Sequence, residues 1–496
     1  MKKVIIVGGG IAGLTAGVYA QQSGLDATIF EMHSIPGGNS TSWKRKGYLF
    51  EGGMHWLVGS NPQTPMHRIW QETGALRENN PIYNRDPFLT YVGEANIISL
   101  YRDPEQLKQQ LMRVSPQDSK EINSLISDIR ILGKMSMPIM DIKGVKIKKK
   151  AAPPLSMLFA MIKALPRMQA LDKISIGEYA RRFRHPGIRT LLKNIAGSDD
   201  FSANAIPFTL GSLAVGDSGY PKGGSLRMAE NIAEEFIALG GVIRYKTRAQ
   251  QVRVEAGRVT GIIAGDIFHE ADAVIVTADT LTAIDSLFET PLHEPWMDEM
   301  RTAIKPLNCT FIGLGVKADL RGLPENPLFP LAELFEYGGI QREHIAFNNY
   351  ANYEGYASEG CTALTCALMG DTYDMWKAAH EDGSYAQKKQ GLAESVIEKL
   401  ARVIPETRGN VEVWDVATPL TYERYCGTWR GSWMSVTYPG KPRQQYPCKS
   451  ERIGNLYFAG QRIMLPGGLP AVASSGRQAV QYLCRDEDLV FQGVMK

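Results

Sequence analysis

The start of the chain alternates between apolar runs and small residues in a way that predicts three successive elements. Residues 4–7 read VIIV, a run rich in β-branched residues that is typical of a buried parallel strand. Residues 11–23 are mostly small and apolar and predict a helix that ends at Gly24. Residues 27–30 predict a second strand, which Glu31 follows directly. This order predicts a βαβ unit with two parallel strands.

Three glycines occupy the turn between the first strand and the helix. Gly8, Gly10 and Gly13 have the spacing G-x-G-x-x-G of a dinucleotide-binding turn. The first permits a tight turn, the second lets a pyrophosphate approach the backbone, and the third lets helix and strand pack closely. Glu31 stands where a carboxylate accepts hydrogen bonds from both ribose hydroxyls. Because that carboxylate would repel a 2′-phosphate, the pattern disfavours NADP and leaves FAD and NAD.

A second glycine pair indicates which of these two dinucleotides the chain binds. Gly37 and Gly38 follow Glu31 by only six and seven residues, in SIPGGNSTS. Nicotinamide dehydrogenases normally continue into another helix here, whereas a second loop against the phosphates is typical of FAD enzymes with a glutathione-reductase-like fold. The far end of the chain agrees, because NLYFAGQRIMLPGGLPAVASSG at 455–476 reads as a strand, a Gly-Gln turn, a glycine loop and a helix.

Together with GYPKGGSLRMAENIAEEF at 219–236 and ADAVIVTADT at 271–280, these stretches resemble the phytoene desaturase, carotenoid isomerase and retinol saturase family of flavoproteins, relatives of the amine oxidases. The resemblance implies an α/β fold in which a glutathione-reductase-like Rossmann domain binds FAD. It also implies a mixed-sheet substrate domain with a helical subdomain beside it, and the composition of residues 143–171 leads us to expect that this subdomain faces a membrane. The boundaries it implies are 1–85, 218–285 and 440–496 for a discontinuous FAD-binding domain, 86–217 for the helical subdomain and 286–439 for the substrate-binding domain.

The same resemblance assigns residues to the non-covalently bound cofactor. Carried over position by position, the FAD-binding residues are Gly8, Gly10, Ile11, Ala12, Gly13, Glu31, Gly37, Gly38, Asn39, Ala249, Ala278, Gly460, Gln461, Gly468, Leu469, Pro470 and Ala471. Ala249 would contact adenine through its backbone, while Gly460 and Gln461 would lie near the pyrophosphate and ribityl chain. Residues 469–471 would line the isoalloxazine ring, with the dipole of the following helix directed at its pyrimidine side.

One position departs from the desaturase pattern. Asn39 stands where phytoene desaturases usually have arginine. The sequence around Asn39, and that around His55 and Trp56, is closer to the isomerase and saturase branches. His55 and Trp56 are the candidates for residues near the flavin, although packing of their loop explains them equally well. The sequence contains no Ser-His-Asp triad and no carboxylate pair with catalytic spacing, which fits chemistry carried by a cofactor.

The middle of the chain shows helical and strand patterns in separate stretches. Period-3.6 patterning predicts helices at 104–114, 119–135 and 175–183, and a longer one near 385–403. Apolar runs predict strands at 309–320, 361–370 and 411–420. We therefore expect helices beside a sheet that covers the flavin.

Composition excludes several other classes of protein. The chain has 496 residues, which indicates two or three domains, and its formal net charge of +3 provides no global attraction for nucleic acid. The six cysteines show neither zinc spacing nor a disulfide framework, so we expect no metal site and a reducing cytoplasm. We expect no signal peptide, and no run of about 20 apolar residues that would cross a bilayer.

Residues 143–171 stand out because five lysines in eight residues precede a run rich in Met, Leu and Phe. One interpretation is a solvated loop before a core helix. The other is peripheral contact with the inner face of a membrane, with the lysines on anionic head groups and Leu155, Met157, Leu158, Phe159 and Ile162 in the acyl boundary. An apolar substrate drawn from a bilayer would make such contact useful.

The leading hypothesis is therefore an FAD-dependent oxidoreductase that acts on carbon–carbon bonds of a long apolar isoprenoid or polyene. Desaturation, saturation and cis–trans isomerisation, each by hydride transfer at flavin N5, stay open, as do the substrate, the redox partner and the oligomeric state. The alternatives are a flavin amine oxidase, which needs an aromatic cage, and a non-catalytic flavin- or lipid-binding partner.

Overall fold

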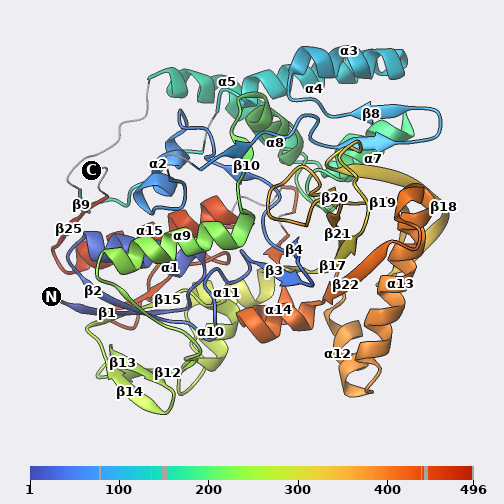
Figure 1. Cartoon of the computed structure of the whole chain (residues 1–496). Coiled ribbons are helices and arrows are strands. Elements are labelled where there is room, and N and C mark those ends of the chain that lie inside the picture. Colours follow the sequence, from blue (N-terminus) through green and yellow to red (C-terminus); the bar gives the residue numbers. More distant parts are fainter. Residues whose placement is uncertain (78–79, 136, 148–154, 437, 441–444, 494–496) are drawn as a thin grey trace.

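A five-stranded parallel sheet that contains the first strands of the chain lies at the left of the molecule in Figure 1, with helices gathered over one face. The structure is a computed structural model that describes residues 1–77, 80–135, 137–147, 155–436, 438–440 and 445–493, without the side chains of 155–160. The strand order is β11 (Val242–Arg244), β2 (Asp26–Phe30), β1 (Lys3–Val7), β15 (Ala273–Val276) and β24 (Leu456–Phe458). The predicted βαβ unit is confirmed, because β1 and β2 pair in parallel and α1 (Ile11–Gln22) connects them. Successive strands run outward from β1 in both directions, which opens a crevice at the carboxyl ends of β1 and β15.

Small residues let the helices on this sheet approach one another. α1 packs against α9 (Gly224–Ala238) and α15 (Leu469–Asp486). A Cβ atom on Gly476 of α15 would lie 2.4 Å from the Ala12 carbonyl oxygen, and one on Gly17 would lie 2.9 Å from the Phe236 ring. The residues of α1 from Ile11 to Ala20 are all buried as a result.

Two four-stranded sheets form the second half of the molecule. The first has the order β20 (Asn348–Asn349), β21 (Thr362–Met369), β17 (Cys309–Val316) and β22 (Val411–Ala417). The second has the order β19 (Ile340–Ala346), β18 (Pro327–Tyr337), β7 (Thr90–Val92) and β8 (Ile97–Ser99). Helices α12 (Tyr373–Glu381) and α13 (Tyr385–Val403) pack their apolar side chains, Trp376 and Leu400 among them, into a core shared with β17.

Residues 100–217 are mostly helical and supply most of one apolar core, to which Phe88, Ile98 and Leu307 also contribute. The helices are α3 (Pro104–Val114), α4 (Ser119–Leu132), α5 (Leu155–Leu171), α6 (Ile176–Ala180), α7 (Pro186–Lys193) and α8 (Ala205–Ala214). The predicted helices at 104–114 and 119–135 are present, and that at 175–183 is shorter than predicted. The segment expected to be helical from residue 86 begins instead with β7 and β8, because β7 pairs in parallel with β18 from a distant part of the chain.

The remaining elements connect these parts. They are β3 (Ser42–Arg45), β4 (Tyr48–Glu51), β5 (Leu57–Val58), α2 (Pro65–Glu72), β6 (Ile82–Tyr83), β9 (Lys146–Ile147), β10 (Ser218–Pro221), β12 (Ala249–Glu255), β13 (Arg258–Ala264), β14 (Ile267–Glu270), α10 (Thr280–Ser286), α11 (Pro295–Ala303), β16 (Pro306–Leu307), α14 (Pro419–Cys426), β23 (Met434–Ser435) and β25 (Val490–Phe491).

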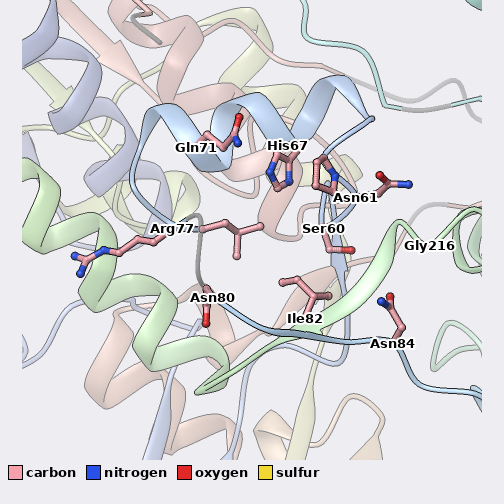
Figure 2. A pocket seen from close by; sticks show the side chains of 11 residues that line it. Ser60, Asn61, His67, Gln71, Arg77, Asn80, Ile82, Asn84 and Gly216 are labelled. Atoms are coloured by element: carbon pink, nitrogen blue, oxygen red, sulfur yellow. The ribbon is translucent and has the colours of Figure 1, made fainter. Parts of the chain in front are cut away.

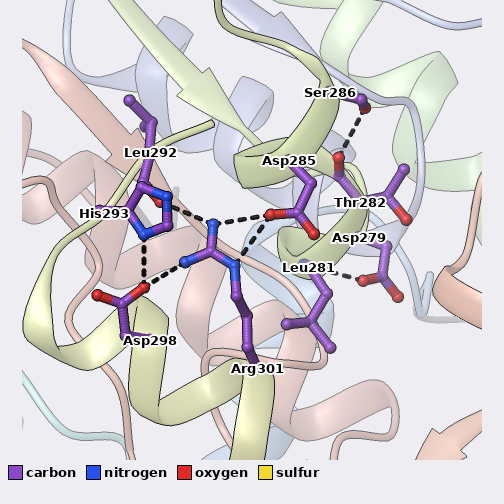
Figure 3. Close-up of polar contacts among 9 residues, drawn as sticks. All are labelled: Asp279, Leu281, Thr282, Asp285, Ser286, Leu292, His293, Asp298 and Arg301. Carbon is purple, nitrogen blue, oxygen red and sulfur yellow. Dashed lines mark hydrogen bonds and ion pairs between the residues drawn. The ribbon is translucent and has the colours of Figure 1, made fainter. Parts of the chain in front are cut away.

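An arginine connects α10 to α11 (Figure 3). Arg301 donates from Nε and Nη2 to Asp285 at 2.9 and 2.7 Å, and from Nη1 to Asp298 at 2.6 Å. Asp279 caps the start of α10, because its carboxylate accepts the Leu281 amide at 3.1 Å. These bonds fix the segment that leaves the carboxyl end of β15. Among the described residues, no helix is both long enough and apolar enough to cross a membrane.

Candidate active site

The two glycine loops meet at the carboxyl end of β1. The Gly37 amide donates to the Gly9 carbonyl at 2.9 Å, and Gly37 also forms a bridge with Gly10. Glu31, at the end of β2, is 6% exposed and accepts the amides of Gly9 at 2.6 Å and of His33 at 2.7 Å. Burial raises the pKa of Glu31, and the two amides oppose that rise. The structure therefore brings both predicted loops and the predicted acid to one place.

The first and third glycines of the turn differ from the second in what surrounds them. A Cβ atom on Gly13 would lie 1.9 Å from the Gly8 carbonyl oxygen, so the protein itself requires glycine there. On Gly10, the nearest atoms would be Gly37 O at 3.8 Å and Gly38 Cα at 4.0 Å, which is ordinary van der Waals contact without a clash. Gly10 is the N-cap of α1, and no described side chain caps that helix. Helix amides that no side chain caps are suited to a phosphate group.

Other predicted FAD-binding residues border the same crevice. The Ala278 amide donates to the Val7 carbonyl at 2.9 Å, and the Gly460 amide donates to Ser475 Oγ on α15 at 2.9 Å. Gln461 follows Gly460 at the end of β24, and its Cβ lies 2.9 Å from where a Cβ on Gly467 would stand. Ala249 is the buried first residue of β12, two residues after Thr247, whose amide donates to the Glu31 carbonyl at 2.9 Å. The side chains of Ile11 and Ala12 are buried in the first turn of α1, which leaves only their backbone for a ligand.

Asn39 supplies a polar atom without a partner. Its Nδ2 donates weakly to the Ser432 carbonyl at 3.4 Å. Its Oδ1 is buried and accepts no hydrogen bond from the described residues. Since buried polar atoms are normally hydrogen-bonded, this oxygen fits a site that receives a polar ligand.

A cavity of about 1310 Å³ begins at the glycine loop that precedes α15. Gly467, Gly468, Leu469, Pro470 and Ala471 line one part of it, together with His55 and Trp56. Gly468 has φ +86° and stands immediately before α15, so the loop turns its backbone into the cavity at the start of that helix. The volume exceeds the roughly 300–1,000 Å³ of ordinary ligand pockets, as expected for a space that holds more than one small molecule. The structure therefore places the two candidate residues and the predicted ring-binding loop on one cavity.

His55 lies among aromatic rings on the cavity wall. Its ring stacks on Phe311 with 6.2 Å between centroids and meets Trp433 edge-on at 5.6 Å. Burial and the neighbouring charge of Arg85 lower the pKa of His55 to about 4. The imidazole is therefore neutral near pH 7 and cannot act there as a cationic acid. Trp56 meets Phe88 edge-on at 5.3 Å.

Arg85 lies at the centre of a buried tyrosine cluster behind His55. Its Nε donates to Tyr353 Oη at 2.6 Å, and its Nη1 donates to the His55 carbonyl at 3.2 Å. Its guanidinium stands 4.9 Å from the centre of the Tyr220 ring, and Glu325 lies 3.4 Å away as an ion-pair partner. Arg85 thus fixes the backbone of His55 relative to the cavity.

A second buried arginine joins the cofactor crevice to the cavity wall. Arg462 and Asp279 are 0% and 1% exposed and pair at 2.9 Å. Arg462 also donates to Ser435 Oγ at 2.6 Å and to Ser432 Oγ. Because Ser432 precedes Trp433, this pair positions the segment that carries Trp433 into the cavity.

These features agree with the comparisons to known proteins. The model of the family of flavin-containing amine oxidoreductases matches residues 11–484. The chain belongs to this family. It is an FAD-dependent oxidoreductase, and the resemblance found in its sequence is confirmed.

Curated relatives of this flavoprotein cover nearly its whole length. All-trans-retinol 13,14-reductase of Danio rerio is 22% identical over 93% of this chain and 83% of its own. Prolycopene isomerase, chloroplastic, of Daucus carota is 23% identical over 97% and 80%. Phytoene desaturase (lycopene-forming) of a Paracoccus species is 22% identical over 98% of both chains. Among solved structures, cyclohexylamine oxidase from Brevibacterium oxydans matches with a TM-score of 0.62 and 15% identity over 98% of this chain and 99% of its own, which shows the shared fold.

Sequence reasoning about this flavoprotein missed several residues of the cavity wall. Arg85, Arg342 and Asn348 all line the cavity. Arg342 lies in the stretch R-E-H-I-A at 342–346, which has no alternation of polar and apolar residues that would mark it as part of a site. Arg85 carried no signal, because its partners come from segments far away in the chain.

The flavoprotein has a second, smaller pocket of about 450 Å³ that shares no lining residue with the cavity (Figure 2). Its wall includes the polar side chains of Asn61, His67, Gln71 and Asn84. Within the part of the chain that the structure describes, no group of three or more His, Cys, Asp or Glu side chains could hold a metal ion.

Proposed function

We propose that this flavoprotein catalyses a redox change or a cis–trans isomerisation at carbon–carbon bonds of a long apolar isoprenoid or polyene. The observation that carries the proposal is the cavity that begins at the Gly467–Gly468 loop. Large apolar side chains contribute much of its wall, among them Trp56, Phe88, Phe208, Leu328, Phe347 and Trp433. The named activities of the curated relatives, on retinol, prolycopene and phytoene, support the same substrate class.

The residues around the crevice bind the cofactor, and those around the cavity bind the substrate. We infer that the two glycine loops, the amides at the start of α1 and Glu31 hold FAD, with Asn39, Ala249, Ala278 and the turn at Gly460 completing the site. FAD, when bound, supplies the capacity to accept or donate a hydride. The aromatic wall aligns an apolar chain beside residues 467–471 and keeps water away. Neutral His55 contributes to the shape of the cavity and to its apolar contacts, and it does not transfer a proton.

We propose one role for each part of the chain. Residues 1–85, 218–285 and 440–496 bind FAD, residues 286–439 bind the substrate, and residues 86–217 cover the cavity from the helical side. α7, α8 and the loop between them supply cavity residues, Asn194, Phe201 and Phe208 among them, which supports the last assignment.

Anaerobic spectroscopy tests the reaction class. The oxidised enzyme and, separately, the photoreduced enzyme are incubated with carotenoids, retinoids and amines, and the flavin absorbance and the products are followed. A desaturase is expected to bleach its oxidised flavin with a polyene, and a saturase to reoxidise its reduced flavin. An isomerase is expected to convert the substrate in the reduced state with no net electron transfer. Bleaching by an amine while every polyene is inert in both states would identify an amine oxidase. A protein inert toward both classes would be a binding partner.

We further propose that residues 143–171 contact the anionic cytoplasmic face of a membrane, from which an apolar substrate is taken. Residues 148–154, with three of the five lysines, lie outside the described residues, as do the side chains of Leu155, Met157, Leu158 and Phe159. On the described part of α5, Ile162 is 62% exposed and Leu165 is 43% exposed, which supports an apolar face open to lipid.

Vesicle sedimentation tests this contact. Each lysine near an anionic surface is worth about 1 kcal/mol, so replacing the five lysines with glutamate is expected to abolish binding to vesicles that contain phosphatidylserine. The matched control exchanges five lysines elsewhere on the surface and is expected to bind as the parent does. Equal sedimentation of the parent and the 143–150 variant would refute the contact.

A further inference from the structure

Two consecutive strands carry polar residues that line the cavity. Arg342 and His344 lie on β19, and Asn348 follows on β20. All three line the cavity. Asn348 lies beside His55, to which it forms a side-chain hydrogen bond. Arg342 precedes Asn348 by six residues, so at most about 20 Å of extended chain separates Arg342 from the part of the cavity wall that holds His55.

Arg342 is a half-buried cation that the protein does not neutralise. Its Nη2 donates to the Met369 carbonyl, while its Nε is buried without a partner in the described part of the chain. None of the ion pairs formed within 4.0 Å by the described residues includes Arg342. Burial correspondingly lowers the pKa of Arg342. A charge that is taken out of water without a counter-charge is costly, so its retention beside a cavity indicates an anion that arrives with a ligand.

The acids on the same cavity wall do not fill this role. Asp172, Asp199, Asp200 and Glu343 are all exposed, so water already solvates them. Asp199 pairs with Lys193 at 2.5 Å. The guanidinium of Arg342 instead lies 5.9 Å from the centre of the Tyr337 ring. Burial and the charge of Arg342 lower the pKa of His344 to about 4, and its Nε2 lies 2.9 Å from Asn194 Nδ2.

We propose that Arg342 binds a terminal carboxylate, so that the substrate is an amphipathic polyene acid held by its head group at β19 and by its apolar chain along the aromatic wall. This inference rests on the proposed function, and it deepens it. A guanidinium is the side chain best suited to a carboxylate, which it can bind through two parallel hydrogen bonds. Neutral His344 and Asn194 add polar contacts without a competing charge. Anchoring one end fixes which bonds of the chain reach residues 467–471, so Arg342 would determine regioselectivity.

Equilibrium binding to the FAD-loaded protein tests the proposal without relying on turnover. All-trans-retinoic acid and all-trans-retinol share one polyene chain and differ in the end group, and quenching of tryptophan fluorescence reports both, since Trp56 and Trp433 line the cavity. The parent protein is expected to bind the acid at least tenfold more tightly than the alcohol. In Arg342→Gln this ratio is expected to fall to within twofold of one, while the affinity for the alcohol stays within twofold of the parent value. Arg342→Lys is expected to keep part of the preference.

Lys173 provides the matched control, because it is an exposed cation on the same cavity wall. Lys173→Gln is expected to keep the preference for the acid, and a loss equal to that of Arg342→Gln would overturn the proposal by showing a general charge effect. A parent protein that binds both retinoids without preference would also overturn it, and the proposed function would stand. A protein that binds neither retinoid nor any carotenoid would overturn the proposed function, and this inference with it. Unchanged alcohol binding in Arg342→Gln shows that the variant is folded.

Discussion

Gly10→Val separates a requirement of the cofactor from a requirement of the protein. Gly10 has extended backbone, with φ −71° and ψ 176°, which a valine also adopts. The nearest atoms to a Cβ there are 3.8 and 4.0 Å away, so the protein without FAD should accept the side chain. The loss of a flexible N-cap residue costs about 1 kcal/mol or less. The same side chain would occupy the space in which we place the pyrophosphate.

The expected loss of affinity follows from the bonds between backbone amides and phosphate. A hydrogen bond to a charged group contributes about 1.5–3 kcal/mol. Since 1.4 kcal/mol is a factor of ten, losing one such bond raises the Kd for FAD by about 10- to 100-fold. Gly10→Val should therefore purify with little or no yellow chromophore, while its apoprotein unfolds at nearly the parent denaturant concentration. Flavin fluorescence titration of the apoprotein measures the Kd, and circular dichroism measures unfolding.

Gly13→Ala is the matched control. Its Cβ would lie 1.9 Å from the Gly8 carbonyl oxygen and 2.6 Å from Thr277 Oγ1, so α1 must move away from β1 whether or not FAD is bound. We expect the apoprotein to lose about 1–3 kcal/mol of stability or more. The reasoning fails if Gly10→Val retains a full flavin spectrum, or if its apoprotein is destabilised as much as that of Gly13→Ala.

Two further predictions concern buried charges. Arg462→Met leaves the Asp279 carboxylate buried without its counter-charge and should lower the free energy of unfolding of the apoprotein by about 3–5 kcal/mol. Adding Asp279→Asn to that variant should recover much of the loss, because asparagine removes the buried charge and keeps the α10 cap. Additive losses in the double variant would contradict this. His55 and His344 have a pKa of about 4 in the folded protein against about 6.5 in an unfolded chain. The unfolded state therefore binds protons first, so stability should fall as pH drops from about 6.5 to about 4, and NMR titration of either ring with a midpoint above 6 would refute the assignment.

Local patterns predicted the parts of the fold in which local chemistry decides the structure. The G-x-G-x-x-G turn, its flanking strands and the helix at 385–403 each follow from the spacing of apolar and small residues, and each is present. β7 and β8 were not predicted, because three residues each in a segment of mixed polarity become strands only when β18 supplies an edge. The cavity wall could not be read from the sequence for the same reason. Arg85 reaches Tyr353 across 268 positions, and Arg462 reaches Asp279 across 183.

The positions in the sequence of the strands of the five-stranded sheet also constrain when this protein can acquire its cofactor. β1 ends at Val7 and β24 begins at Leu456, so the strands that frame the crevice are synthesised about 450 residues apart. At roughly 5–20 residues per second, the last strand emerges about 20–90 s after the first. During that interval the first βαβ unit exposes apolar strands and helix faces that α9, β15 and finally α15 cover. Because β24 and α15 complete the crevice, we expect FAD to be bound tightly only after nearly the whole chain has been synthesised.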